Sequence, residues 1–255
     1  MDWSKIKTVL IWIFAFVNLF LLSVYFDGTF TSKTLDEDVI LGTVEILRQN
    51  NIAIDKETVP KNLDNVKICS VENKFADVKS MLETACNSSD EGFLNAENIE
   101  IDGENFVCKF KLDKEIRPEK LIKKSGLIAN SDYKKVEKDD GVYYYLSFEN
   151  KVFFDSYIKV KITDGKNVEI YGKNWLGDKV SQESVAKIVS PAEILINFST
   201  QYNGEKNVKI NSMTAGYFIG ERNETVRATA SPVWEISTSD GDKCYYDMRN
   251  GDLLK

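Results

Sequence analysis

The hydrophobic pattern separates a short N-terminal segment from the rest of the chain. Residues 8–26 read TVLIWIFAFVNLFLLSVYF, which is 19 positions without a charged side chain. As an α-helix this run is roughly 28 Å long, close to the ~30 Å hydrocarbon core of a bilayer. It is longer than the apolar region of a signal peptide, and it leads into Asp27 without a small-x-small cleavage pattern. The pattern therefore predicts an uncleaved transmembrane anchor.

The charges beside this run predict its orientation. Lys5 and Lys7 precede it, whereas Asp27 and the acidic stretch 36–38 follow it, with Lys33 as the one base between them. Because basic residues are retained on the cytoplasmic side, we expect a cytoplasmic N-terminus and an extracytoplasmic C-terminal part.

Apolar residues at helical spacing predict four further helices. The first has a capping-box sequence, Thr34-Leu-Asp-Glu37, and the last follows Ser190 with proline at its first position. The third has Pro118 in its first turn and Gly126 as its stop. The expected ranges are 34–49, 75–86, 114–124 and 191–202.

Strands are predicted where apolar and polar residues alternate. Short strands are expected at 52–54 and 66–71. Asp-Gly or Asn-Gly occurs seven times, and these dipeptides favour the type I′ turns of β-hairpins. Four of them lie in segments that we interpret as antiparallel hairpins: IEIDGENFVCKFKL, KKVEKDDGVYYYLSFE, IKVKITDGKNVEIYGK and WEISTSDGDKCYYDM.

The order of elements predicts an α+β fold in which a transmembrane helix precedes two units, each made of a helix and an antiparallel sheet. The expected division is a cytoplasmic N-terminus at 1–7, an anchor at 8–26, a linker at 27–33, a first extracytoplasmic α+β unit at 34–113 and a second at 114–255.

The amino-acid composition excludes several classes of enzyme and metal site. The 255 residues include no histidine, which excludes Ser-His-Asp hydrolases, Cys-His proteases, His-ligated metal sites and phosphotransfer from a histidine. The net charge is −7, so nucleic acid is not an expected partner. No acidic residue stands in a distinctive catalytic frame, and no glycine-rich phosphate loop occurs. We therefore expect no enzyme activity, no cofactor and no metal.

Two residue groups have alternative interpretations. Tyr143 and Tyr145 share one face of a predicted strand and could form a stacking platform for sugars or bases, but burial of the sheet is the favoured explanation. Of the cysteines, Cys108 alternates with Phe106 and Phe110 and is expected to be buried. Disulfides and free thiols remain equally open for Cys69, Cys86, Cys108 and Cys244.

The predicted anchor contains polar and aromatic features that suit contacts with other membrane helices. Asn18 lies near its middle, where an amide is costly unless a neighbouring helix offers a partner. Trp3 is placed for the membrane interface, and Trp12 lies nine residues further along. A single tolerated asparagine in an isolated span is the alternative.

The N-terminal sequence MDWSKIKTVLIWIFAFVNLFLL resembles the opening of the YycI (WalI) family, in which M-D-W-x-x-x-K-T leads into a single span with an Asn-Leu-Phe-Leu-Leu segment. The C-terminal run SPVWEISTSDGDKCYYDMRNGDLL is similar to the closing strands of that family and, more loosely, of PepSY modules.

The resemblance implies a regulator of the WalK/WalR (YycG/YycF) two-component system, which controls cell-wall metabolism in Gram-positive bacteria. It implies a fold like that of YycH and YycI, a YycH-like partner and contacts with the sensor kinase through membrane spans. The residues expected to make these contacts are Trp3, Trp12, Asn18, Leu19, Phe20 and Leu22. The alternative is an anchored PepSY-like binding or inhibitor module that acts on a protease or wall enzyme.

Overall fold

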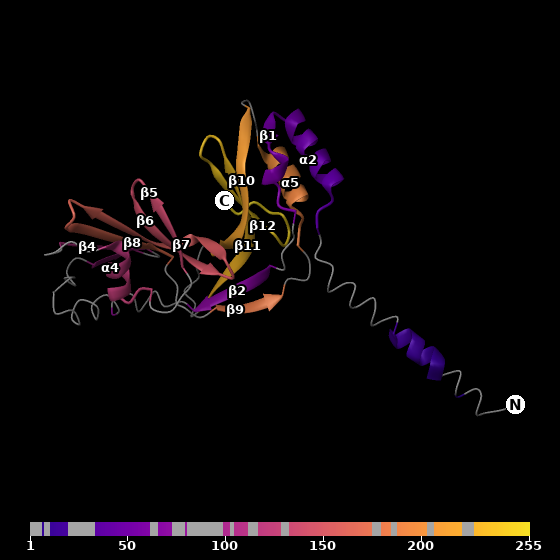
Figure 1. Ribbon diagram of the computed structural model, residues 1–255, viewed down its shortest axis with the longest axis horizontal. Helices are drawn as coiled ribbons and strands as arrows, with labels where there is room; N and C mark the ends of the chain where they lie inside the picture. Colours follow the sequence, from indigo (N-terminus) through magenta and orange to yellow (C-terminus); the bar gives the residue numbers. More distant parts are fainter. Residues whose placement is uncertain are drawn as a thin grey trace.

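A curled β-sheet with helices packed against it forms the body of the protein (Figure 1). The structure is a computed structural model that describes residues 7, 11–19, 34–61, 66–72, 80, 99–102, 105–111, 117–128, 133–174, 180–184, 188–202, 207–220 and 227–255. The combination of this sheet with helices confirms the predicted α+β class. Within these ranges residues 11–19 are helical, and no helix is both long and apolar enough to cross a membrane.

The sheet has twelve strands among the described residues. They are β1 (Ile52–Ile54), β2 (Lys67–Glu72), β3 (Ile99–Asp102), β4 (Asn105–Lys111), β5 (Tyr133–Lys138), β6 (Gly141–Phe148), β7 (Lys151–Thr163), β8 (Asn167–Lys173), β9 (Val180–Ser184), β10 (Val208–Phe218), β11 (Arg227–Thr238) and β12 (Lys243–Asp247).

The four predicted hairpins are confirmed as the antiparallel pairs β3–β4, β5–β6, β7–β8 and β11–β12. In the second hairpin the two-residue loop is Asp139-Asp140, because Lys138 pairs with Gly141. Gly141 therefore opens β6 rather than forming the turn. Its φ is 145°, and a Cβ atom there would lie 2.8 Å from the carbonyl oxygen of Val160, so the position requires glycine.

Two pairings depart from the expected antiparallel sheets. Strand β1 lies parallel to β10, and β7 lies parallel to β10 through Phe153 and Tyr217. Strands before and after residue 113 also pair with each other, as β4 does with β8 and β2 with β11. The sheet therefore mixes strands from the two expected units, since β2 lies between β11 and β9. Their division at residue 113 stays a prediction.

The described helices are α2 (Glu37–Gln49), α4 (Pro118–Lys124) and α5 (Pro191–Gln201), with a 3₁₀ turn η1 (Lys56–Thr58). Helix α5 starts as predicted: the Ser190 hydroxyl accepts a 3.2 Å hydrogen bond from the Glu193 N–H, and the Glu193 carboxylate accepts one of 2.9 Å from the Ser190 N–H. Helix α4 begins at Pro118, four residues later than expected, after Arg117 in extended conformation. The predicted helix 75–86 lies outside the described residues except for Ser80, which is helical.

The capping box predicted at Thr34 is wrong. The residue that precedes α2 is Asp36, whose side chain makes no capping hydrogen bond. Thr34 lies in an isolated bridge, and the Leu35 N–H donates to the Lys61 carbonyl at 2.8 Å. This backbone contact holds the chain extended where the helix was expected to begin.

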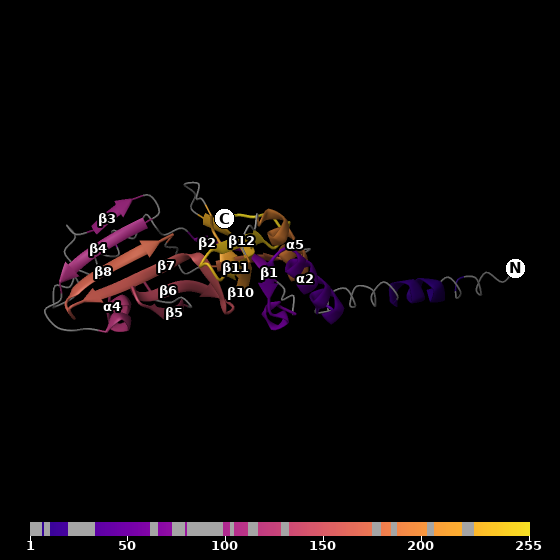
Figure 2. The same ribbon diagram turned by 90° about the horizontal axis from the view of Figure 1, so that it is seen from above.

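Two hydrophobic clusters lie on the face of the sheet against which the helices pack. In one, Ile40 of α2 and Ile194 of α5 meet Ile210 of β10. In the other, Ile122 of α4 meets Ile158 of β7. Figure 2 shows α2 and α5 beside β10 and β11, and α4 beside β7 and β8.

Side-chain alternation follows the predicted pattern in β4 and β6. Phe106, Cys108 and Phe110 are buried together, and so is Tyr144. Tyr143 stacks on Tyr145 on the opposite face, with ring centroids 5.9 Å apart. Cys69 and Cys244 are free thiols, Cys69 and Cys108 are buried, and Cys86 lies outside the described residues.

Replacing Tyr144 by phenylalanine is expected to stabilise the protein. The Tyr144 hydroxyl is buried and has no hydrogen-bond partner among the described residues, so its removal eliminates a desolvation cost of about 1 kcal/mol or more. Burial raises the pKa of Tyr144 from 10 to about 12. Between these values the unfolded chain releases a proton that the folded protein retains, so stability falls as the pH rises from 10 to 12.

Urea unfolding of the wild type and of Tyr144→Phe at pH 7 and across pH 9–12 tests this prediction. The variant should have the higher midpoint at pH 7 and a shallower alkaline loss. Tyr202→Phe is the control, since Tyr202 is half-buried at the end of α5. A lower midpoint for Tyr144→Phe at pH 7 would contradict the interpretation.

Candidate functional site

The structure describes three of the six residues that are predicted to contact membrane partners. Trp12, Asn18 and Leu19 lie in the helical stretch 11–19, whereas Trp3, Phe20 and Leu22 lie outside the described residues. Trp12 and Leu19 are 63% and 65% exposed. The Asn18 side-chain N–H donates to the Phe14 carbonyl at 2.8 Å, so its own helix already satisfies one donor. Partner contacts through these residues stay a prediction.

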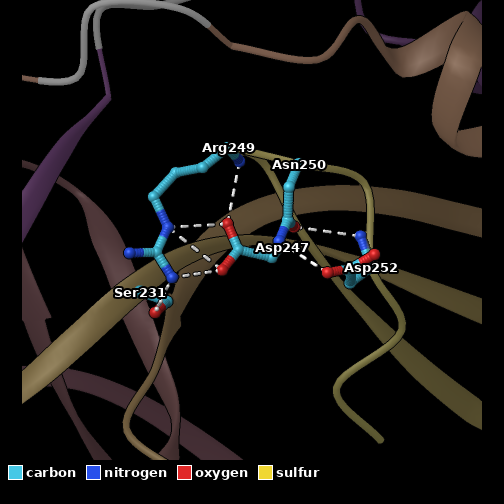
Figure 3. A network of polar contacts seen from close by, with 5 residues as sticks. All are labelled: Ser231, Asp247, Arg249, Asn250 and Asp252. Carbon is cyan, nitrogen blue, oxygen red and sulfur yellow. Dashed lines mark hydrogen bonds and ion pairs between the residues drawn. The ribbon is translucent and has the colours of Figure 1, made fainter.

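The C-terminal turn after β12 is held by an ion pair between the buried Asp247 and the exposed Arg249 (Figure 3). Asp247 is only 1% exposed. Its carboxylate accepts hydrogen bonds of 2.8 Å from the Arg249 backbone N–H and 2.9 Å from the Arg249 Nε. The Arg249 guanidinium also donates to Ser231 of β11 at 2.9 Å, and the hydrogen bond with Asp247 raises the pKa of Arg249. The pair therefore joins the chain end to β11.

The same turn is tied to helix α5. Gly251 has φ of 79°, and its N–H donates to the Asp247 carbonyl at 2.8 Å. The Asn197 side chain of α5 donates to the Gly251 carbonyl at 3.2 Å, and a Cβ atom on Gly251 would lie 2.8 Å from the same nitrogen. The Asn-Gly sequence at 250/251 thus turns the chain back along β12, where Leu253 forms an antiparallel bridge with Tyr246.

A hollow occurs on the other face of the sheet, opposite the described helices. It has a volume of about 290 Å³, and we call it the aromatic trough. Its lining residues are Lys134, Val136, Lys138, Tyr145, Val152, Phe154, Glu235, Lys243 and Tyr245. They come from β5, β6 and β7 on one side and from β11 and β12 on the other.

Glu235 is the polar centre of the β11–β12 side of the trough. Although it is buried, its carboxylate accepts hydrogen bonds of 3.0 Å from Lys243 and 2.9 Å from the Tyr245 hydroxyl. Burial, followed by the charge of Glu235, raises the pKa of Tyr245. Tyr245 therefore stays protonated and continues to donate to Glu235.

Lys138 occupies the opposite side. Its ammonium lies 4.2 Å from the centroid of the Tyr143 ring and donates to the Tyr145 hydroxyl at 3.0 Å. Burial acts to lower the pKa of Lys138, but the hydrogen bond with Tyr145, together with the charge interactions of the neighbouring tyrosines and Asp140, outweighs it and raises the pKa. Lys138 is therefore a fixed positive charge beside an aromatic surface.

The sequence pattern indicates Tyr143 and Tyr145 as a pair on one face of a strand but does not indicate the trough. The signal that could have indicated it is the alternation of Lys134, Val136 and Lys138, which places the two lysines on one face of β5. The other side comes from strands almost a hundred residues away. Among the described residues, no group of three or more His, Cys, Asp or Glu side chains could hold a metal ion.

Breaking the Asp247–Arg249 pair is expected to destabilise the fold. Arg249→Gln leaves the buried Asp247 carboxylate without its charged partner, which should lower the free energy of unfolding by about 2 kcal/mol. Chemical denaturation measures the change. Arg48→Gln is the matched control, because Arg48 forms an exposed i,i+3 pair with Glu45 on α2, and the loss of such a pair should change stability much less. Equal losses in the two variants would show that the C-terminal pair has no special role.

Comparison with known proteins places the chain in a family. No curated protein matches it. Among solved structures it is similar to an uncharacterized protein from Eubacterium rectale, with 11% identity, a TM-score of 0.44, and coverage of 88% of this chain and 99% of the other. The family model described as "YycI protein" matches residues 34–248. This range spans the α2 region and every strand of the described sheet, so the chain belongs to the YycI family.

Proposed function

We propose that the protein is a membrane-anchored, non-enzymatic regulator of a WalK-type sensor histidine kinase, and that it acts together with a YycH-like protein on cell-wall signalling. The observation that carries this proposal is the family match over residues 34–248, because YycI proteins are regulators of the WalK system. The proposed topology is a cytoplasmic N-terminus, one span at 8–26 and an extracytoplasmic C-terminal part.

The N-terminal segment supports the membrane part of the proposal. Its 19 residues without charge suit a bilayer span. The described portion, 11–19, is helical, and its apolar side chains are exposed: Ile11, Trp12, Ile13, Phe14, Phe16, Val17 and Leu19. Such a surface is suited to lipid or to the spans of another membrane protein.

Regulation of this kind requires differential affinity. The protein must bind one conformation of the kinase more tightly than another, and a difference of ~1.4 kcal/mol changes their ratio tenfold. Packing of one span against kinase spans can supply such a difference through close contacts and interhelical hydrogen bonds. Activation and inhibition both fit this scheme.

An experiment can determine whether the span or the ectodomain regulates the kinase. Residues 1–33, the full chain, and a chain whose span is replaced by an unrelated one are expressed in a deletion strain, and transcription of the kinase regulon is measured. We expect residues 1–33 to restore a substantial part of the regulation and the exchanged span to lose it. Regulation that survives the exchange and is absent with residues 1–33 would favour the extracytoplasmic binding module instead.

The role of Asn18 is a separate prediction. Asn18→Leu should weaken crosslinking to kinase spans severalfold if its amide hydrogen-bonds across helices, since such bonds contribute about 1 kcal/mol in membranes. Val17→Leu is the matched control, because it enlarges a neighbouring apolar residue without removing a polar group. If crosslinking were unchanged in Asn18→Leu, the Asn18 amide would have no role beyond its hydrogen bond to the Phe14 carbonyl.

A further inference from the structure

We propose that the aromatic trough is a binding site for a small organic anion that joins a carboxylate to a flat ring. The proposal concerns a ligand of the ectodomain and does not depend on kinase regulation. It stands on the shape of the trough, its charge and the placement of its rings.

The trough is a concave surface built by neighbouring strands of the curled sheet. Strands β5, β6 and β7 pair in order, β7 pairs with β10, and β10, β11 and β12 continue the sequence. Each of these strands except β10 supplies a lining side chain. Side chains that would lie far apart on a flat sheet therefore face one another across the hollow.

Strand β10 contributes by having no side chain at Gly216. A Cβ atom there would lie 2.3 Å from the Phe154 ring and 2.6 Å from the Val152 carbonyl oxygen. The Phe154 ring can consequently lie over β10, where it contacts Tyr245 with ring centroids 5.5 Å apart. Gly216 thus allows an aromatic residue in the middle of the trough, between the two sides.

The charge of the trough is opposite to that of the protein. Its lining includes three lysines and one carboxylate, whereas the chain as a whole carries a net charge of −7. Glu235 is already neutralised by Lys243. Among the described residues, no carboxylate forms an ion pair with Lys134 or Lys138. Two ammonium groups therefore remain for an anion, and an ammonium–carboxylate hydrogen bond is among the stronger polar contacts.

The aromatic rings beside these lysines favour a ligand that carries a flat ring next to its carboxylate. Tyr145 stacks on Tyr143 and lies at the β6 side, and Phe154 and Tyr245 lie toward β12. A flat ring can stack on such faces while a carboxylate attached to it reaches Lys134 or Lys138. The volume of about 290 Å³ restricts the ligand to a small molecule.

The probe for this site is 4-fluorophenylacetate, observed by fluorine NMR with the full chain in phosphatidylcholine nanodiscs. We expect it to bind at least tenfold more tightly than 4-fluorophenylacetamide, which has the same ring without the charge. Lys134→Gln and Lys138→Gln should each weaken binding about tenfold, since each removes a charge-assisted hydrogen bond. Tyr145→Leu should weaken it through loss of stacking.

Lys166→Gln is the matched control. It removes the same charge from the β7–β8 turn, outside the trough, and should leave binding unchanged. Thermal unfolding of every variant verifies folding, and the lysine variants suffice if Tyr145→Leu does not fold. Equal binding of acid and amide, equal effects of Lys138→Gln and Lys166→Gln, or no binding of the acid to the wild type would each overturn the proposal.

Discussion

The fold depends on the junction where β7 leaves β10. Phe153 of β7 pairs with Tyr217 of β10, and their buried rings lie with centroids 4.9 Å apart. Two residues further along β7, the buried Asp155 carboxylate accepts hydrogen bonds of 3.0 Å from the Ile219 N–H and 2.9 Å from the Gly220 N–H. These bonds satisfy the backbone at the end of β10, where the ladder no longer provides partners. Burial raises the pKa of Asp155, and the same backbone bonds oppose that increase.

The junction explains why the sheet has two hydrophobic clusters and one hollow. Beyond it, β7 pairs with β8 on one edge and β6 on the other, and the β6–β7 register shifts between Tyr145 and Ser147. Such an irregularity bends a strand and increases its twist. The two parts of the sheet therefore turn relative to each other, so that α4 covers one part and α2 and α5 the other. On the opposite face the same curvature brings β5 toward β12 and forms the trough.

Local features of the structure were predictable from the sequence, and the joining of distant segments was not. The hairpins and the Ser190 cap are encoded within a few residues, by turn dipeptides and by Ser-Pro-x-Glu. The prediction that a helix begins at Thr34 is wrong, because a hydrogen bond from the Leu35 N–H to the Lys61 carbonyl outweighs the local preference of Thr34 for capping a helix. The pairing of β7 with β10 links residues more than sixty positions apart through a single register pair. Alternation within a strand contains no information about such a partner, and the trough depends on it.

A ligand in the trough would lie far along the sheet from the predicted span. The predicted span enters the ectodomain at α2, which packs with α5, β1 and β10, whereas Lys134 and Lys138 belong to β5 in the other part of the sheet. A ligand that contacts β5 and β12 together connects both parts, and it favours the angle between them that gives the best contacts. Binding can influence the span only if that angle differs between the states of the kinase complex, because a ligand with equal affinity for two states shifts neither. Should the ligand be regulatory, its effect would pass through the contacts that join the two parts, which include the Phe153–Tyr217 pair, the bonds of Asp155 to the end of β10 and the ion pair of Lys67 with Glu149.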